Sequence, residues 1–291
     1  MYREVSKENN LEIVKLLVKY GADVNAIDNY RIPVVSRAVV SRDIDIIRFL
    51  IDNGANIENA ESSEQGSQSN PIDLLYYPII EGRLDIVKLL LNNGAKISLE
   101  DRSGDVLSTT VARGNLHMAQ FLLKYGIDVN ARSHDGQTAL FSSETQKMTQ
   151  FLIDSGAKVN AKDDGLRTAL FEAAQWTDAA WAKTLIDNGA QVNVRANDGK
   201  TPLFNASTIE ITQLLIDNGA YLNAKDKYGL TPLHMAIRNK RNDVAKLLIN
   251  SGADIQAKTN ENRATLYQAS TIELAKLLID GGADINAKDI S

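Results

Sequence analysis

The sequence of 291 residues predicts an all-α solenoid of stacked helix pairs. Nine apolar, helix-like segments each end in Gly-Ala, or once in Gly-Ile, followed after one residue by Val, Ile or Leu and usually then by Asn. These glycines are Gly21, Gly54, Gly94, Gly126, Gly156, Gly189, Gly219, Gly252 and Gly282. Their spacings of 33, 40, 32, 30, 33, 30, 33 and 30 residues indicate one unit repeated from end to end. We therefore expect one continuous array, with no separate domain for catalysis.

Composition excludes several classes of protein. The net charge of −5 argues against a general nucleic-acid or membrane-surface role. Because cysteine is absent, the chain has no disulfide, no thiolate zinc site and no thiol nucleophile. No apolar run approaches the ~18 residues that a membrane-spanning helix needs. The polar first ten residues lack the apolar core of a signal peptide, so we expect a cytoplasmic protein without membrane insertion.

The clearest unit runs from Asp226 to Lys258. It opens with turn residues, Asp226–Gly229. Thr231 can then cap a first helix that has Pro232 at its first position, where no backbone N–H is required. A second apolar stripe, Val244–Ile249, predicts a second helix. Gly252 supplies the left-handed conformation that ends this helix.

This unit resembles the ankyrin repeat. The family element T-P-L-H stands whole at Thr231–His234 and, varied, at Thr138–Phe141, Thr168–Phe171, Thr201–Phe204 and Ala264–Tyr267. The family ending G-A-D-V-N-A stands at Gly21–Ala26 and recurs, varied, in all nine copies. The resemblance covers essentially the whole chain and implies antiparallel helix pairs, joined by β-hairpin-like fingers and stacked into a curved solenoid. Each pair would bury its apolar faces only against its neighbours.

The repeats differ in length. We place them at 1–27 (partial), 28–60, 61–100 (with a long finger insertion), 101–132, 133–162 (short), 163–195, 196–225 (short), 226–258 and 259–291 (short). Short repeats lack three residues, about one helical turn, so we expect a shorter first helix or a tighter corner in them. In the third repeat the polar segment Glu58–Asn70 predicts an elongated finger, and Pro78 predicts a broken or kinked helix.

No catalytic or metal-binding constellation is evident. His234 lies in the T-P-L-H slot, where the resemblance implies structural hydrogen bonding, and His117 is expected on a solvated helix face. His134 lies beside an aspartate in a finger turn but lacks further His or Cys ligands, so we expect no metal. The segment Asp198–Thr201 ends like a phosphate-binding loop, but Val194 stands where that loop requires glycine. We expect no enzyme activity and no cofactor.

The aromatic residues divide into two groups. Phe141, Phe171, Phe204 and Tyr267 hold the slot that His234 fills elsewhere, so we expect them to pack inside the array. Trp181 occupies a core position of a second helix and is expected to be buried. Trp176 instead falls at the outward end of a first helix, which in ankyrin proteins faces the concave groove and often contacts partners. Exposed tryptophan is a favoured binding anchor.

By resemblance, the partner surface would combine the finger tips with the exposed ends of the first helices. The candidate contacts are His134, Gln137, Leu166, Arg167, Trp176, Asn197, Lys200, Lys227, Tyr228, Leu230, Arg238 and Arg263. A basic finger row stands six residues after successive repeat glycines, at Arg132, Lys162, Arg195, Lys225, Lys258 and Lys288. It would suit an acidic partner, although Asp163, Asp226 and Asp289 would partly neutralise it.

We therefore interpret the chain as a non-enzymatic scaffold that binds a protein. The alternative is a targeting or regulatory segment of a longer enzyme or of a host-directed bacterial effector, which would place it in a host cytoplasm. The last helix looks like an internal one with no polar replacement, so the C-terminal end could meet a partner. The resemblance also implies asparagine hydroxylation where a suitable oxygenase shares the compartment, and the matching residues are Asn25, Asn130, Asn160, Asn193, Asn223 and Asn286.

Overall fold

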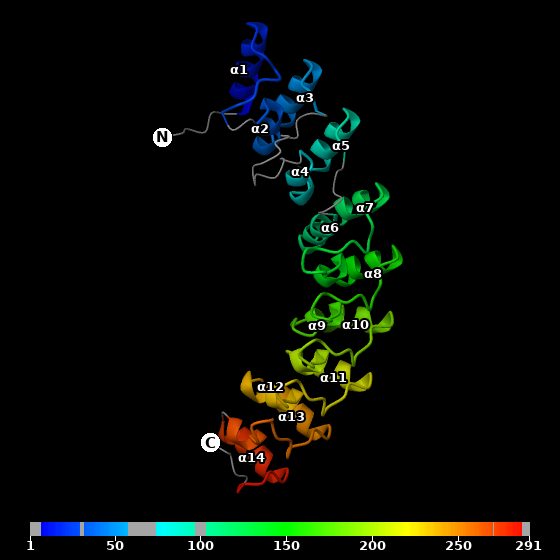
Figure 1. The fold of residues 1–291 in the computed structure, drawn as a ribbon, viewed down its shortest axis with the longest axis vertical. Coiled ribbons are helices and arrows are strands. Elements are labelled where there is room, and N and C mark those ends of the chain that lie inside the picture. Colours follow the sequence, from blue (N-terminus) through cyan, green and yellow to red (C-terminus); the bar gives the residue numbers. More distant parts are fainter. Residues whose placement is uncertain (1–6, 30–31, 58–73, 97–102, 270, 287–291) are drawn as a thin grey trace. The chain divides into compact units, whose positions relative to one another are not determined.

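The computed structural model describes residues 7–29, 32–57, 74–96, 103–269 and 271–286. The predicted finger Glu58–Asn70 lies outside these residues. Helices and turns alternate through the described chain, in which no β-strand forms, so the predicted all-α class is confirmed (Figure 1). The chain divides into two compact units, Met1–Lys124 and Tyr125–Ser291, a division that the repeat pattern did not predict.

The first unit contains seven helices among the described residues: α1 (Lys7–Lys19), α2 (Val34–Ser41), α3 (Ile44–Asp52), α4 (Tyr76–Ile80), α5 (Leu84–Asn92), α6 (Ser103–Ala112) and α7 (Leu116–Lys124). Pairs α2–α3, α4–α5 and α6–α7 pack as adjacent helices. The prediction that Pro78 breaks its helix is wrong. Helix α4 begins at Tyr76, so Pro78 lies in the first turn, where its missing N–H removes no helical hydrogen bond.

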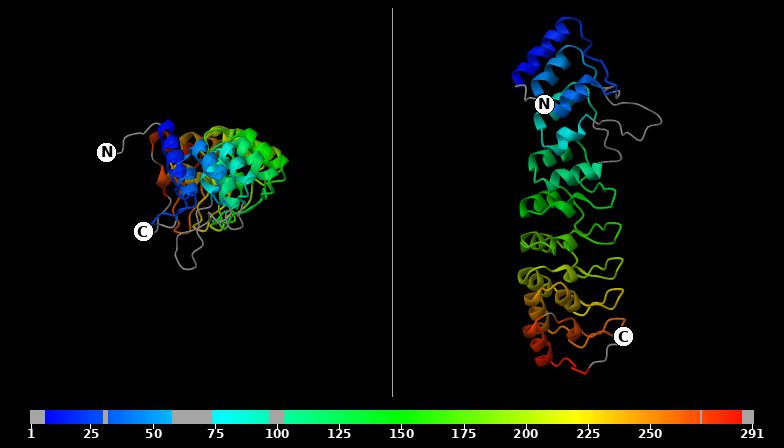
Figure 2. Two further views of the ribbon diagram at one scale, coloured as in Figure 1. Left: turned by 90° about the horizontal axis from the view of Figure 1, so that it is seen from above. Right: turned by 90° about the vertical axis from the view of Figure 1, so that its left-hand side faces the viewer.

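The second unit contains α8 (Gln146–Asp154), α9 (Ala169–Ala173), α10 (Ala179–Asp187), α11 (Ile209–Asp217), α12 (Pro232–Arg238), α13 (Asn242–Asn250) and α14 (Ile272–Asp280). Its described residues also contain three 3₁₀ turns, η1 (Ala139–Ser142), η2 (Pro202–Asn205) and η3 (Thr265–Gln268). Within this unit the second helices stack in chain order, and the fingers project to one side (Figure 2).

The three-residue shortening removes the first helix itself. Each short repeat has a four-residue 3₁₀ turn where the eighth repeat has the seven-residue helix α12. The prediction of a shorter first helix is therefore confirmed. A threonine follows each turn and caps the next helix: the hydroxyls of Thr145, Thr208 and Thr271 accept the N–H three residues on, at 3.3, 3.2 and 3.2 Å.

Asparagine side chains connect successive repeats. In the second unit, Asn160 Nδ2 donates to the carbonyl of Gly189 at 2.9 Å, while its Oδ1 accepts the N–H of Gln191 at 2.8 Å. Asn193 makes the same two bonds to Gly219 and Tyr221, both at 2.8 Å. We call this arrangement the amide clamp. Asn25 and Asn130 complete it at their own repeats, and Asn223 accepts the N–H of Asp254 at 2.8 Å.

The amide clamp fixes the backbone that leaves each second helix. The carbonyl of the repeat glycine lies at a helix end, where backbone acceptors have no partner within the helix. One amide group satisfies this carbonyl and also a backbone N–H two residues further on, so it holds neighbouring repeats in a single register. A side-chain amide offers a donor and an acceptor on one planar group.

Buried His234 fixes the start of α12. Its Nδ1 lies 2.8 Å from the hydroxyl of Thr231 and 3.2 Å from the N–H of that residue, which completes a capping box. Structural hydrogen bonding is thus confirmed for His234, and Trp181, Phe141, Phe171 and Phe204 are buried as expected. Burial lowers the pKa of His234, an effect that the backbone of Arg263 opposes only in part.

We predict that the amide clamp can be dissected at Asn160. Asn160→Asp keeps the acceptor but loses the bond to Gly189, and should lower the free energy of unfolding by about 1 kcal/mol, whereas Asn160→Ala loses both bonds and about 2 kcal/mol. Urea denaturation of the full chain measures both. Asn250→Asp, on the exposed end of α13, is the control and should change the value by less than ~0.5 kcal/mol. Equal effects of all three variants would contradict the assignment.

His234 predicts a stability change in mildly acidic solution. Because its folded pKa lies below its unfolded value of about 6.5, the unfolded chain binds the proton more strongly. The contribution of His234 to the free energy of unfolding should be fully present above pH ~6.5 and should be lost as the pH drops below that value. In the variant His234→Phe, which copies the buried Phe204, the free energy of unfolding should fall less between pH 7 and pH 5 than it does in the parent protein. An identical pH dependence in the two proteins would show that His234 does not cause it.

Candidate functional site

The fingers of the second unit form a continuous hydrogen-bonded edge. Each finger turn is closed by a backbone bond, such as Asp163 N–H to Arg167 O at 2.9 Å and Asp226 N–H to Leu230 O at 2.9 Å. Backbone bonds then join one turn to the next. They run from Asp164 to Asp135 (3.3 Å), Asn197 to Gly165 (2.9 Å), Lys227 to Asp198 (2.8 Å) and Asn260 to Tyr228 (2.9 Å). The finger tips therefore present side chains from a fixed backbone, as a binding surface requires.

Short polar side chains close each turn a second time. The carboxylate of Asp226 accepts the N–H groups of Tyr228 and Leu230 at 2.9 Å, and Asp163 accepts that of Arg167 at 2.8 Å. Ser133 and Thr259 do the same with their hydroxyls, each at 3.2 Å. Asp163 and Asp226 consequently point into their own fingers. Asp163 forms an ion pair with Arg167. The partial neutralisation of the basic finger row by these two carboxylates stays a prediction, and Asp289 lies outside the described residues.

The basic finger row makes bonds along the array. Arg132 donates to the carbonyl of Lys162 at 2.7 Å, Arg195 to that of Lys225 at 2.5 Å, and Lys225 to that of Lys258 at 3.4 Å. Arg132 also pairs with Asp164 at 3.0 Å. These cations thus support the finger backbone, while Lys288 lies outside the described residues.

Leu166 holds a strained backbone conformation. It occupies the turn position that Gly136, Gly199 and Gly229 fill in other fingers, and like them it has a positive φ, here 59°. A side chain at such an angle costs roughly 1–2 kcal/mol. Nevertheless Leu166 is 43% exposed, so its side chain gives little burial in return. An exposed apolar residue retained at a strained position is a reasoned candidate for a contact.

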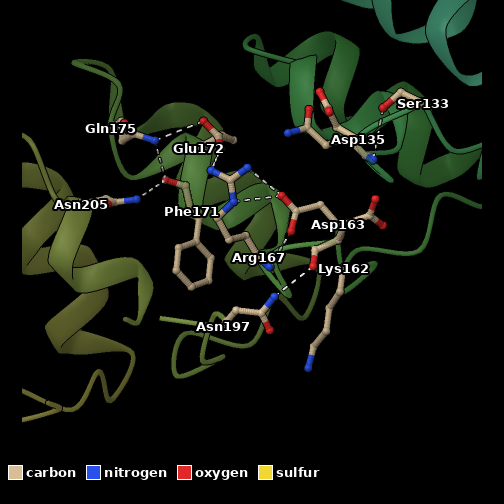
Figure 3. A network of polar contacts seen from close by, with 12 residues as sticks. Ser133, Asp135, Lys162, Asp163, Arg167, Phe171, Glu172, Gln175, Asn197 and Asn205 are labelled. Carbon is tan, nitrogen blue, oxygen red and sulfur yellow. Dashed lines mark hydrogen bonds and ion pairs between the residues drawn. The ribbon is translucent and has the colours of Figure 1, made fainter. Parts of the chain in front are cut away.

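Arg167 belongs to a polar network beside that turn (Figure 3). Its guanidinium pairs with Asp163 at 2.8 Å and with Glu172 of α9 at 3.2 Å. Gln175 donates to Glu172 at 3.1 Å, and Asn205 of the next repeat donates to the carbonyl of Phe171 at 3.4 Å. Arg167 therefore connects its finger to the first helix of the same repeat, and its positive charge is paired with the carboxylates of Asp163 and Glu172.

Trp176 lies just beyond α9 and is 42% exposed. Its ring meets that of buried Trp181 edge-on, with centroids 6.2 Å apart. Edge-to-face pairs of this kind add about 0.5–1.5 kcal/mol beyond area burial. The exposed face of Trp176 is consequently presented from a fixed support, a property typical of binding anchors.

The remaining predicted contacts lie on the fingers or at the end of α12. Lys200 pairs with Asp198 at 2.7 Å. Burial alone would raise the pKa of Asp198, but the hydrogen bond from Lys200 and its charge lower it overall. His134 is exposed beside Asp135, Gln137 closes its turn, and Asn197 donates to the carbonyl of Asp164 at 3.0 Å. One cavity, at the last two fingers, is lined by four further predicted contacts: Tyr228, Leu230, Arg238 and Arg263. Lys227 does not line the cavity but lies over the ring of Tyr228.

Tyr267 corrects one prediction and adds a surface residue. Its slot is buried in four other repeats, yet Tyr267 is 55% exposed and lines the same cavity. Thr265 of η3 is fully buried, as the same position is in the other repeats of the second unit, and it donates to the carbonyl of Ile255 at 2.6 Å. The phenolic hydroxyl was the available signal, because tyrosine prefers sites that keep this group near water or a partner.

The described residues contain no group of three or more His, Asp or Glu side chains that could hold a metal ion. Nor is any helix among them long and apolar enough to cross a bilayer.

The family profile "Ankyrin repeats (3 copies)" matches this sequence in overlapping segments, 4–101, 74–163, 107–196, 142–226, 170–259 and 207–289. These segments cover nearly the whole chain. The chain belongs to the ankyrin-repeat family. Proteins of this family are in general interaction modules without enzyme activity.

Two curated relatives are viral. A putative ankyrin repeat protein of Acanthamoeba polyphaga mimivirus is 29% identical over 128 residues, which are 44% of this chain and 36% of that protein. A putative ankyrin repeat protein of fowlpox virus (strain NVSL) is 41% identical over 58 residues, 20% of this chain and 9% of that protein. This ankyrin-repeat chain thus matches only a minor part of either relative's length.

A solved structure shares the ankyrin fold. The ankyrin repeat domain of Bcl-3, a member of the IkappaB protein family, is 27% identical and aligns with a TM-score of 0.54. The alignment covers 63% of this chain and 88% of that domain.

The strain at Leu166 predicts that Leu166→Gly raises the free energy of unfolding by about 0.5–1 kcal/mol, because glycine adopts positive φ without cost. The reverse change, Gly199→Ala, should lower it, since φ is 83° and a Cβ would lie 3.2 Å from Asp226 Cα. Thermal and urea unfolding measure both. A Leu166→Gly variant less stable than the parent would show that the leucine contributes packing that outweighs its strain.

Proposed function

We propose that this ankyrin-repeat chain is a non-enzymatic scaffold that binds a protein through the finger tips and first-helix ends of its second unit. The observation that carries the proposal is the exposure of Leu166 and Trp176 on fixed supports, one of them at a cost in backbone strain. Large side chains of this kind dominate binding energy when they enter a partner's pocket. The finger ladder supplies the rigid frame.

Because long and short repeats alternate, this surface is uneven. Trp176 and Arg238 both follow or end a first helix in a long repeat, whereas the neighbouring repeats have only a 3₁₀ turn. Side chains at those two ends therefore project past their neighbours. A partner would meet alternating projections and recesses, which favours an extended segment that fits them.

A role as a targeting or regulatory segment of a longer protein is the alternative. It is supported by the lengths of the relatives, of which this chain matches 36% and 9%. A longer open reading frame with a catalytic domain would favour that role. The location, whether in the cytoplasm of the source cell or of a host, follows the same distinction and is tested by fractionation of the source cells.

The last helix offers a second contact. Ile272 and Ile279 of α14 are 73% and 44% exposed, which is unusual for β-branched apolar residues on one helix. We propose that this face meets a partner or a further repeat.

Trp176 and Trp181 provide a paired test. Affinity capture with cross-linking from the source cell identifies the partner, and calorimetry then measures its affinity. Trp176→Ala should weaken binding by at least ~2 kcal/mol, the level of a hot spot, and lower stability by no more than ~1.5 kcal/mol, the aromatic pair energy. Trp181→Ala should instead destabilise by ~3–5 kcal/mol through a core cavity.

Trp176→Phe, which keeps an aromatic ring beside Trp181, is the control and should retain most of the stability and part of the binding. Equal destabilisation by the two alanine variants would show that Trp176 acts only as core.

A further inference from the structure

One cavity of about 850 Å³ opens between the last two fingers of the second unit. Tyr228 and Leu230 of the eighth repeat line it on one side, and Arg263 and Tyr267 of the ninth line it on the other. Arg238, the last residue of α12, also lines it. Its volume lies within the range of ~300–1,000 Å³ that is usual for ligand pockets.

The difference in first-helix length creates this cavity. Helix α12 has seven residues, and η3, which packs against it, has four. The helix is therefore longer than its neighbour, by about 2.5 Å at the usual rises per residue of α- and 3₁₀-helices, and Arg238 stands at its end. Tyr267, which would be buried if it followed the other repeats, is exposed here and lines the cavity.

The cavity combines aromatic surface with surplus positive charge. Arg238 forms no ion pair with any residue that the structure describes. Lys227 Nζ stands 5.0 Å from the centroid of the Tyr228 ring, and its charge is likewise without a carboxylate partner within 4 Å among the described residues. Arg263 pairs with Glu261 at 3.1 Å, so among the lining residues one carboxylate offsets one of two cations. Lys227 adds a further positive charge beside the Tyr228 ring.

This chemistry fits an acidic segment of a protein. An arginine with free donors binds carboxylates through paired hydrogen bonds. The rings of Tyr228 and Tyr267, with Leu230, offer apolar surface for a neighbouring side chain of the same segment. A nucleic acid fits less well, because Glu261 lines the cavity and the chain carries a net charge of −5.

We propose that the cavity binds an extended acidic peptide of the partner, with a carboxylate on Arg238 and an adjacent apolar or aromatic side chain on the two tyrosines. This assignment rests on the proposed scaffold function and names the chemistry of its ligand.

The test uses the full chain and a displayed library of random twelve-residue peptides, so no partner need be known. Peptides selected by the parent protein should be enriched in Asp and Glu beside an apolar residue. The most enriched peptide, labelled with fluorescein, is then titrated by anisotropy. Arg238→Glu should weaken its binding at least about tenfold, the effect expected for a lost charged hydrogen bond, and the parent affinity should fall as salt is raised.

Variants separate charge from ring contact and from folding. Tyr267→Ala should weaken binding by about tenfold or more, whereas Tyr267→Phe should bind nearly as the parent does. Arg113→Glu makes the same charge change at an exposed site beyond α6 in the first unit and should leave binding unchanged. Thermal unfolding confirms that each variant is folded.

The outcomes distinguish this inference from the scaffold function. Peptides that bind the parent but are insensitive to Arg238→Glu and Tyr267→Ala would overturn the cavity assignment and leave the scaffold function standing. Selection of basic or neutral peptides would overturn the acidic ligand. Tighter binding of a labelled single-stranded oligonucleotide than of any selected peptide would overturn both.

Discussion

The second unit depends on one interaction, the amide that bridges each repeat to the next. A helix pair cannot bury its apolar faces alone, so its stability comes from its neighbours. Apolar contact is non-directional and tolerates sliding, whereas the amide clamp requires one register. Asn160 and Asn193 show this directly, each joining a glycine carbonyl and a backbone N–H of the following repeat. In the first unit the corresponding positions after two repeat glycines hold Glu58 and Ser98, outside the described residues.

A fixed register allows the surface to vary. Finger backbones bond to one another and to their own Asp, Ser or Thr side chains, so the exposed positions are free to differ. The exposed side chains differ in their roles. Leu166 keeps an apolar side chain at a strained angle, and Trp176 rests on buried Trp181. Arg132, Arg195 and Lys225 of the basic finger row instead bond to neighbouring carbonyls and support the frame.

The alternation of long and short repeats makes that surface uneven. Loss of three residues replaces a helix by a 3₁₀ turn but leaves the second helices and their clamps in place. Stacking therefore continues while the first-helix side becomes uneven. The cavity around Arg238 and Tyr267 results from this offset, and it concentrates aromatic surface and unpaired charge in one place.

The sequence by itself determined the repeat, its helix pairs, the shortened first helices, the buried Trp181 and the roles of His234 and Gly252, because turn, cap and apolar periodicity are local signals. Only the tertiary structure decided which charged side chains form ion pairs and which repeat positions are buried. Arg167 and Asp163 neutralise each other, Pro78 lies in the first turn of a helix rather than breaking one, and Tyr267 faces a cavity despite a position that is buried elsewhere. Each of these outcomes depends on where a neighbouring element ends in space, which a repeat pattern along the chain does not specify.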